Sequence, residues 1–102
     1  MATRVTVGKV ADIKPGEGKA VQAGGKTIAV FNVGGAFYAI DDACTHAGGP
    51  LSEGGVSGSS VTCPWHGAEF DLKTGEVQCP PAGAGVKAYP VHIEGEAISL
   101  EL

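Results

Sequence analysis

One stretch of the chain, residues 44–67, limits what it can fold into more than any other. It reads CTHAGGPLSEGGVSGSSVTCPWHG and holds two of the three cysteines and two of the three histidines. The wider region from 43 to about 81 is rich in Gly, Ser and Pro, so few of its residues can form a core. Inserts of this length are disordered or functional, and metal coordination can replace a missing core. A structural zinc, an iron–sulfur cluster, a thiol enzyme and coincidence are the alternatives.

The rest of the chain is expected to be β structure. The whole chain has 17 glycines, more than twice the usual share, which is about 7%. Gly24-Gly25 and Gly34-Gly35 separate three short strands between residues 19 and 42, and each pair supplies the positive φ angles of a two-residue hairpin. Residues 28–33 are apolar on both faces except for Asn32, which predicts a central strand.

The two ends of the chain also predict strands. Residues 3–7 alternate apolar and polar side chains, and residues 10–20 indicate a turn that a single turn of helix can precede. Near the C-terminus a hairpin is expected about Gly95-Glu96, with Ile98, Leu100 and Leu102 facing inward. No window of 11 residues has a helical period. The chain is therefore expected to be all-β, and its 102 residues suit one domain.

Charge and cysteine content narrow the class of protein. Seven basic and 11 acidic residues give a net charge of −4, which argues against nucleic acid or an anionic membrane as partner. The N-terminus has no apolar signal region, and the apolar runs are too short to cross a bilayer. An odd number of cysteines, two of them beside histidines, makes a disulfide scaffold the weaker interpretation. A cytoplasmic location is expected.

The spacing of the candidate ligands separates the metal alternatives. Cys44 and His46 form a C-x-H pair, Cys63 and His66 form a C-x-x-H pair, and 16 residues lie between the pairs. Structural zinc sites usually group Cys with Cys and His with His. Here each pair is mixed, which suits a binuclear centre whose loops each give one thiolate to one iron and one imidazole to the other.

This pattern resembles the Rieske [2Fe–2S] motif, in which two histidines replace two cysteines on one iron. The likeness covers most of the chain, including FDLKTGEV and the later Pro80-Pro81. The resemblance implies one [2Fe–2S] cluster, with Cys44 and Cys63 on the inner iron and His46 and His66 on the outer iron. It also implies that Pro80-Pro81 covers the cluster, and that backbone N–H groups approach the sulfurs at Gly48, Gly49 and Gly67.

The fold implied by the resemblance is a small antiparallel β sandwich or barrel. Its base would comprise about 1–42 and 82–102, and two loops at about 43–81 would form a cluster-binding subdomain within a single Rieske domain of residues 1–102.

Departures from the quinol-oxidising branch of the family indicate a function. Gly49 and Trp65 stand where that membrane-anchored branch has two further cysteines, and Ala68 and Phe70 stand where it has hydroxyls. The chain therefore resembles soluble, low-potential Rieske ferredoxins. We expect a one-electron carrier, not an enzyme, between a flavin-dependent ferredoxin reductase and a terminal ring-hydroxylating oxygenase. The small subunit of an assimilatory nitrite reductase and a zinc-stabilised interaction module are the alternatives.

Three further residues have plainer interpretations. Cys79 lies outside the motif and is expected to be a spare thiol, since the coordination set is already complete. His92 alternates with Val91 and Ile93, so it is expected to face solvent without a nearby partner. Trp65 is expected to shield the cluster or to pack locally.

Overall fold

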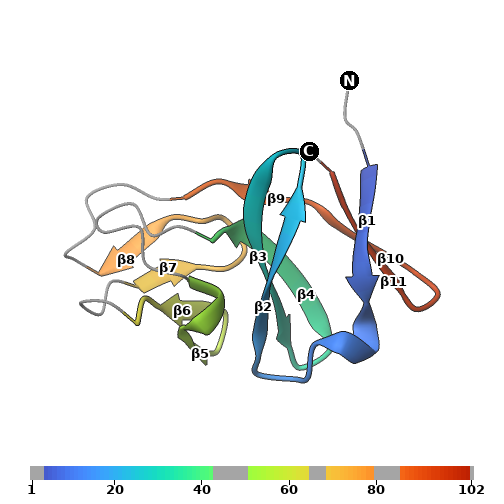
Figure 1. Cartoon of the computed structure of the whole chain (residues 1–102). Coiled ribbons are helices and arrows are strands. Elements are labelled where there is room, and N and C mark those ends of the chain that lie inside the picture. The colour runs from blue at the N-terminus through green and yellow to red at the C-terminus, as the bar shows by residue number, and fades with distance from the viewer. Residues whose placement is uncertain (1–3, 43–50, 65–68, 80–85, 102) are drawn as a thin grey trace.

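A computed structural model describes residues 4–42, 51–64, 69–79 and 86–101, which form three antiparallel sheets (Figure 1). Within these ranges the helical elements are two short 3-10 helices, and there is no α-helix. This confirms the all-β fold expected from the missing helical period. Neither described helix has the length and apolar character needed to cross a membrane.

The central sheet has the order β2-β3-β4-β9 and contains the predicted hairpins. Its strands are β2 (Gly18–Ala23), β3 (Lys26–Val33), β4 (Ala36–Asp41) and β9 (Ala88–Tyr89). The two glycine pairs have φ angles between 58° and 97°, as the hairpin prediction requires. The prediction that 28–33 form a central strand is confirmed, because β3 pairs with β2 on one side and β4 on the other.

A second sheet joins the two ends of the chain. It has the order β1-β11-β10, from β1 (Arg4–Lys9), β10 (Val91–Glu94) and β11 (Ala97–Glu101). The 3-10 helix η1 (Val10–Asp12) follows β1 and is the expected single helical turn. Ile98 and Leu100 are buried as predicted, whereas Leu102 lies outside the described residues.

The third sheet was not predicted. It has the order β5-β6-β7-β8 and follows the 3-10 helix η2 (Leu51–Glu53). Its strands are β5 (Gly55–Ser57), β6 (Ser60–Thr62), β7 (Glu69–Asp71) and β8 (Val77–Cys79). Strands of three residues are too short to show the alternation that identifies a strand in a sequence.

The expectation that this region has too few residues for a core was also wrong. Leu51, Val61, Phe70 and Leu72 are buried in one cluster with Cys63. The 3-10 helix η2, the strands β6 and β7 and the turn after β7 each contribute one large buried side chain, so the composition of the segment understates its core.

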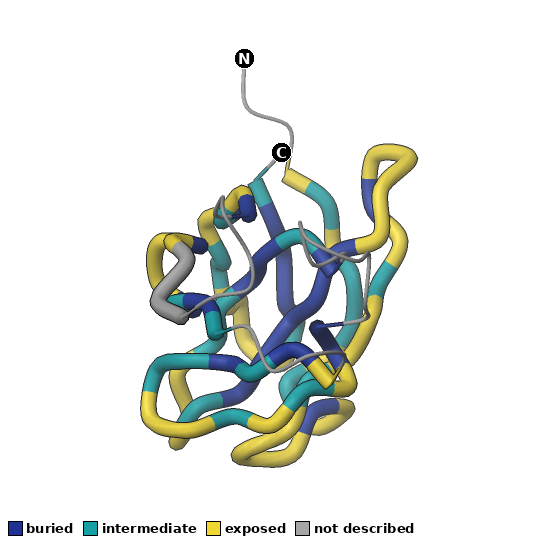
Figure 2. Tube along the Cα trace, turned by 90° about the vertical axis from the view of Figure 1, so that its left-hand side faces the viewer, coloured by how far each residue is buried: buried dark blue, intermediate teal, exposed yellow. Residues whose placement is uncertain are grey.

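The central sheet packs on both of its faces. Ala29 and Phe31 of β3 join the core shared with the third sheet, whereas Ile28 and Val30 join the core shared with the β1-β11-β10 sheet. Successive side chains of a strand point to opposite faces, which explains why residues 28–31 of β3 are all apolar and buried. Figure 1 shows the central sheet between the other two, and Figure 2 shows buried strands inside a rim of exposed turns.

Candidate metal centre

Of the four candidate ligands, only Cys63 belongs to the described residues. It follows β6 directly, is 1% exposed and packs in the core of the third sheet. The other three ligands and several residues named with them lie outside the described ranges: Cys44, His46, Gly48, Gly49, Trp65, His66, Gly67, Ala68, Pro80 and Pro81.

One end of the third sheet gathers the described residues that flank the second ligand pair. The strand register places Gly55, Thr62, Glu69 and Cys79 in one row across the four strands. Cys63 follows Thr62, and Glu69 comes directly after residues 65–68, while residues 80–85 follow Cys79. The segments that carry His66 and Pro80-Pro81 are therefore attached at the same end of this sheet.

The segment with the first ligand pair is attached near the same end. The backbone N–H of Leu51 donates to the carbonyl oxygen of Asp42 at 2.7 Å, so residues 42 and 51 meet on either side of 43–50. The N–H of Ser52 donates to Oδ1 of Asp42 at 2.8 Å. Because Leu51 packs in the same core cluster as Cys63, both ligand segments begin next to one core.

Two glycines let backbone segments approach closely, Gly54 at this end of the third sheet and Gly75 in the β7–β8 turn at its opposite end. A Cβ atom on Gly54 would overlap the carbonyl oxygen of Thr62, and one on Gly75 would overlap that of Val86. The N–H of Val86 donates to the Gly75 carbonyl at 2.8 Å, which ties the chain after residues 80–85 to the turn before β8. Sequence reasoning missed both roles, since glycine content indicates where a chain turns but not which backbone comes near.

A tyrosine–carboxylate contact joins the chain on either side of the ligand segments. The Tyr89 hydroxyl of β9 donates to Oδ1 of Asp41 at 2.6 Å, and the N–H of Asp41 donates to the Lys87 carbonyl at 3.0 Å. Burial and the neighbouring carboxylate of Asp41 raise the pKa of Tyr89 to about 12. The Lys87 ammonium lies 5.2 Å from the centre of the Tyr89 ring. This contact fixes β9 on β4 beside Asp42.

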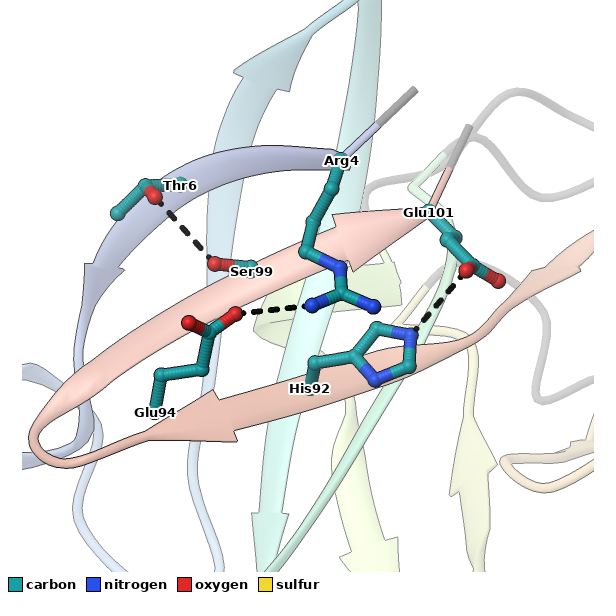
Figure 3. A network of polar contacts seen from close by, with 6 residues as sticks. All are labelled: Arg4, Thr6, His92, Glu94, Ser99 and Glu101. Atoms are coloured by element: carbon teal, nitrogen blue, oxygen red, sulfur yellow. Dashed lines mark hydrogen bonds and ion pairs between the residues drawn. The ribbon is translucent and has the colours of Figure 1, made fainter. Parts of the chain in front are cut away.

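Cys79 and His92, two further residues singled out in the sequence, lie in different sheets. Cys79 ends β8 opposite Glu69, and its role as a spare thiol stays a prediction. His92 lies half-buried on β10, and its Nε2 is 3.4 Å from Oε1 of Glu101, so the expectation of no nearby partner was wrong. Arg4 pairs with Glu94 on the same face at 3.0 Å (Figure 3). This sheet lies across the central sheet from β5–β8, which separates His92 from Cys63 (Figure 1).

A comparison with protein families decides the nature of the centre. Residues 3–90 match the model of the Rieske [2Fe-2S] domain. The chain belongs to the Rieske [2Fe–2S] family. Its cofactor is a Rieske [2Fe–2S] cluster, and this replaces the structural-zinc alternative.

Individual proteins are similar to this Rieske domain in sequence or in fold over nearly their whole lengths. The 3-phenylpropionate/cinnamic acid dioxygenase ferredoxin subunit of Shigella boydii is 44% identical over 100 residues, which cover 97% of this chain and 93% of the relative. The ferredoxin of carbazole 1,9a-dioxygenase from Nocardioides aromaticivorans has a TM-score of 0.91 at 33% identity and 96% coverage of both chains.

Two more solved structures bear on the choice of partner. A chain in the complex of reduced oxygenase and oxidised ferredoxin of carbazole 1,9a-dioxygenase has a TM-score of 0.88 at 32% identity, covering 95% of this chain and 91% of that one. A nitrite reductase small subunit from Mycobacterium tuberculosis has a TM-score of 0.91 at 22% identity, covering 100% of this chain and 96% of the other. The second likeness shows the fold alone.

Proposed function

We propose that this Rieske domain is a one-electron carrier that receives electrons from a flavin-dependent ferredoxin reductase and passes them to a terminal ring-hydroxylating oxygenase. The observation that carries the proposal is the 44% identity with a dioxygenase ferredoxin subunit over nearly the full length of both chains. The similarity to a chain solved in a complex of oxygenase and ferredoxin adds support for the oxygenase as partner. The chain itself would act as a carrier and not as an enzyme.

We further propose that Cys44 and Cys63 hold the inner iron and that His46 and His66 hold the outer iron. The described part of the chain supports this through Cys63, which directly follows β6 and is buried among apolar side chains. Two sulfides and two thiolates balance two ferric ions, so an oxidised cluster with neutral imidazoles is formally uncharged. A neutral group can lie against an apolar core without the large cost of burying an unpaired charge.

We propose different roles for the base and for the cluster-binding subdomain. The base, about 1–42 and 82–102, would form a rigid support, and the subdomain at about 43–81 would hold the cluster within one domain of residues 1–102. When bound, the cluster supplies reversible one-electron chemistry. The protein's own part is to bury Cys63, to join the two ends of 43–50 at Asp42, and to fix Val86 on Gly75.

Direct electron transfer tests this function. The protein, reduced anaerobically, is mixed in a stopped-flow instrument with the oxygenase component of the 3-phenylpropionate dioxygenase system, and the absorbance of both clusters is followed. We expect one electron per chain to pass to the oxygenase, whereas the oxidised protein, as control, should pass none. Efficient transfer to the catalytic subunit of a nitrite reductase, with none to the oxygenase, would favour the alternative and contradict the proposal.

A further inference from the structure

Asp42 occupies a special place between the base and the proposed cluster loop. It follows β4 directly and is only 9% exposed. Its own N–H donates to the carbonyl of Thr27 at 3.2 Å, which fixes it to the central sheet. Its carbonyl accepts from Leu51 at 2.7 Å, and its Oδ1 accepts from Ser52 at 2.8 Å. Asp42, which precedes residues 43–50, therefore bonds both to Thr27 in the central sheet and to Leu51 and Ser52, which follow residues 43–50.

Asn32, a second buried polar residue of the base, shows that hydrogen bonds of this kind do not require a charged side chain. Asn32 is 5% exposed, its Nδ2 donates to the carbonyl of Ile13 at 2.9 Å, and its Oδ1 accepts from the N–H of Gly35 at 2.9 Å. A neutral amide serves both bonds. The Ser52 N–H needs only an acceptor, which an amide oxygen would also provide. The negative charge at Asp42 therefore goes beyond what this hydrogen bond requires.

The position of that charge gives it an electrostatic effect on the cluster. Only Ala43 separates Asp42 from Cys44, so chain geometry keeps the Cα atoms of Asp42 and Cys44 within about 7 Å of each other. Charges interact more strongly in the protein interior than in water, because the effective dielectric constant is lower. Reduction adds a negative charge to the cluster. A fixed carboxylate nearby raises the energy of the reduced form and so lowers the reduction potential.

We infer that Asp42 is a positioning residue that clasps the cluster loop through its carbonyl and Oδ1 and lowers the reduction potential of the cluster through its buried charge. The inference rests on the proposed ligands Cys44 and His46. The carbonyl belongs to the backbone and remains in every variant, whereas the Oδ1 acceptor and the charge are separate properties of the side chain, so different substitutions separate these two.

Three variants of the cluster-loaded protein test the inference. Asp42→Asn keeps an acceptor for Ser52 and removes the charge, so its potential should rise while the cluster is retained as long as in the wild type. Asp42→Ala also loses the acceptor, so it should lose visible absorbance several-fold faster in the presence of an iron chelator. Asp41→Asn is the matched control, because the same charge is removed from the adjacent, half-buried residue that bonds Tyr89. Its rise in potential should be smaller.

Voltammetry tests the effect of the Asp42 charge on the reduction potential, and the rate of cluster loss to the chelator tests the clasp. A potential in Asp42→Asn that rises no more than in Asp41→Asn overturns the role of the charge. Cluster retention in Asp42→Ala equal to that of the wild type overturns the role of the Oδ1 acceptor in the clasp. A fourth variant, Asp42→Glu, keeps the charge: if it holds the cluster and Asp42→Asn does not, the acceptor role is overturned as well. These measurements need no partner protein. A wild type without a cluster would overturn the ligand proposal together with this inference, whereas a normal cluster with unaffected variants would overturn this inference alone.

Discussion

Gly25 in the base and Gly75 beside the third sheet have nearly the same backbone, with φ angles of +78° and +79°, but very different surroundings. A Cβ on Gly25 would meet no atom within 4 Å, whereas one on Gly75 would overlap the carbonyl of Val86. Gly25 serves only to turn the chain. Gly75 also brings two backbone segments into contact, so the structure of the cluster-side region, residues 51–64 and 69–79, depends at this point on a neighbour outside that region.

Strand length shows the same difference. The β2–β3 and β3–β4 pairs each run over six residues, whereas the β5–β6 and β6–β7 pairs run over three. Short pairs contribute few hydrogen bonds of their own. The cluster-side region should therefore depend on its loops and its cofactor for stability, while the base should be stable without them.

The largest expected effect comes from removing the proposed ligand Cys63. Cys63→Ala should abolish the visible absorbance, and amide hydrogen exchange should rise in β5–β8 while β3 stays protected. Cys79→Ser is the control, because Cys79 lies outside the ligand set, and it should leave the spectrum unchanged. Bleaching by Cys79→Ser together with a coloured Cys63→Ala protein would contradict the ligand assignment. Equal loss of protection in β3 would contradict the difference between the regions.

Alanine at the two matched glycines sharpens the comparison directly. Gly25→Ala should cost only the strain of a positive φ, about 1–2 kcal/mol. Gly75→Ala adds a steric overlap that the Val86 backbone cannot avoid without moving, so its total cost should be about 2–5 kcal/mol. Urea unfolding measures both. Equal costs would show that Gly75 serves as a turn residue only.

The Tyr89–Asp41 contact, at the junction of the two regions, should make stability depend on alkaline pH. The pKa of Tyr89 is raised from 10.0 to about 12, so the folded state keeps a proton that the unfolded chain loses above pH 10. The associated stability is complete below pH 10 and is lost as the pH rises to about 12, by at most about 3 kcal/mol. Tyr89→Phe should remove this part of the pH slope in urea unfolding between pH 9 and 12. An unchanged slope would contradict the role of the contact.

The smallest expected effect concerns Phe70, which is buried in the same hydrophobic core as Cys63. A hydroxyl that donates to a cluster sulfur or to the Cys63 Sγ stabilises the reduced form more than the oxidised form. Taking about 1–2 kcal/mol for this difference, Phe70→Tyr should raise the potential by roughly 40–90 mV. Phe37 is partly buried against the core on the other face of the central sheet, so Phe37→Tyr is the control and should leave the potential unchanged. A lowered potential in Phe70→Tyr would contradict the prediction.

Local residue chemistry allowed much of the base to be predicted from the sequence. The hairpins at Gly24-Gly25 and Gly34-Gly35 follow from a property of glycine itself, its access to positive φ, and need no knowledge of the rest of the chain. The central position of β3 follows from a run that is apolar on both faces. The mixed pairs at Cys44, His46, Cys63 and His66 identified the family in the same local way, and their roles as ligands remain predictions.

The arrangement around Cys63 was decided only by tertiary structure. Strands of three residues carry no readable period, and their register depends on partners that the sequence does not specify locally. The junction at Asp42 depends on Leu51 and Ser52, which lie across the whole first ligand segment, and the need for Gly75 arises from Val86. Contacts between distant residues are set by packing, so spacing could nominate candidate ligands, whereas the residues packed around Cys63 could not be found from the sequence.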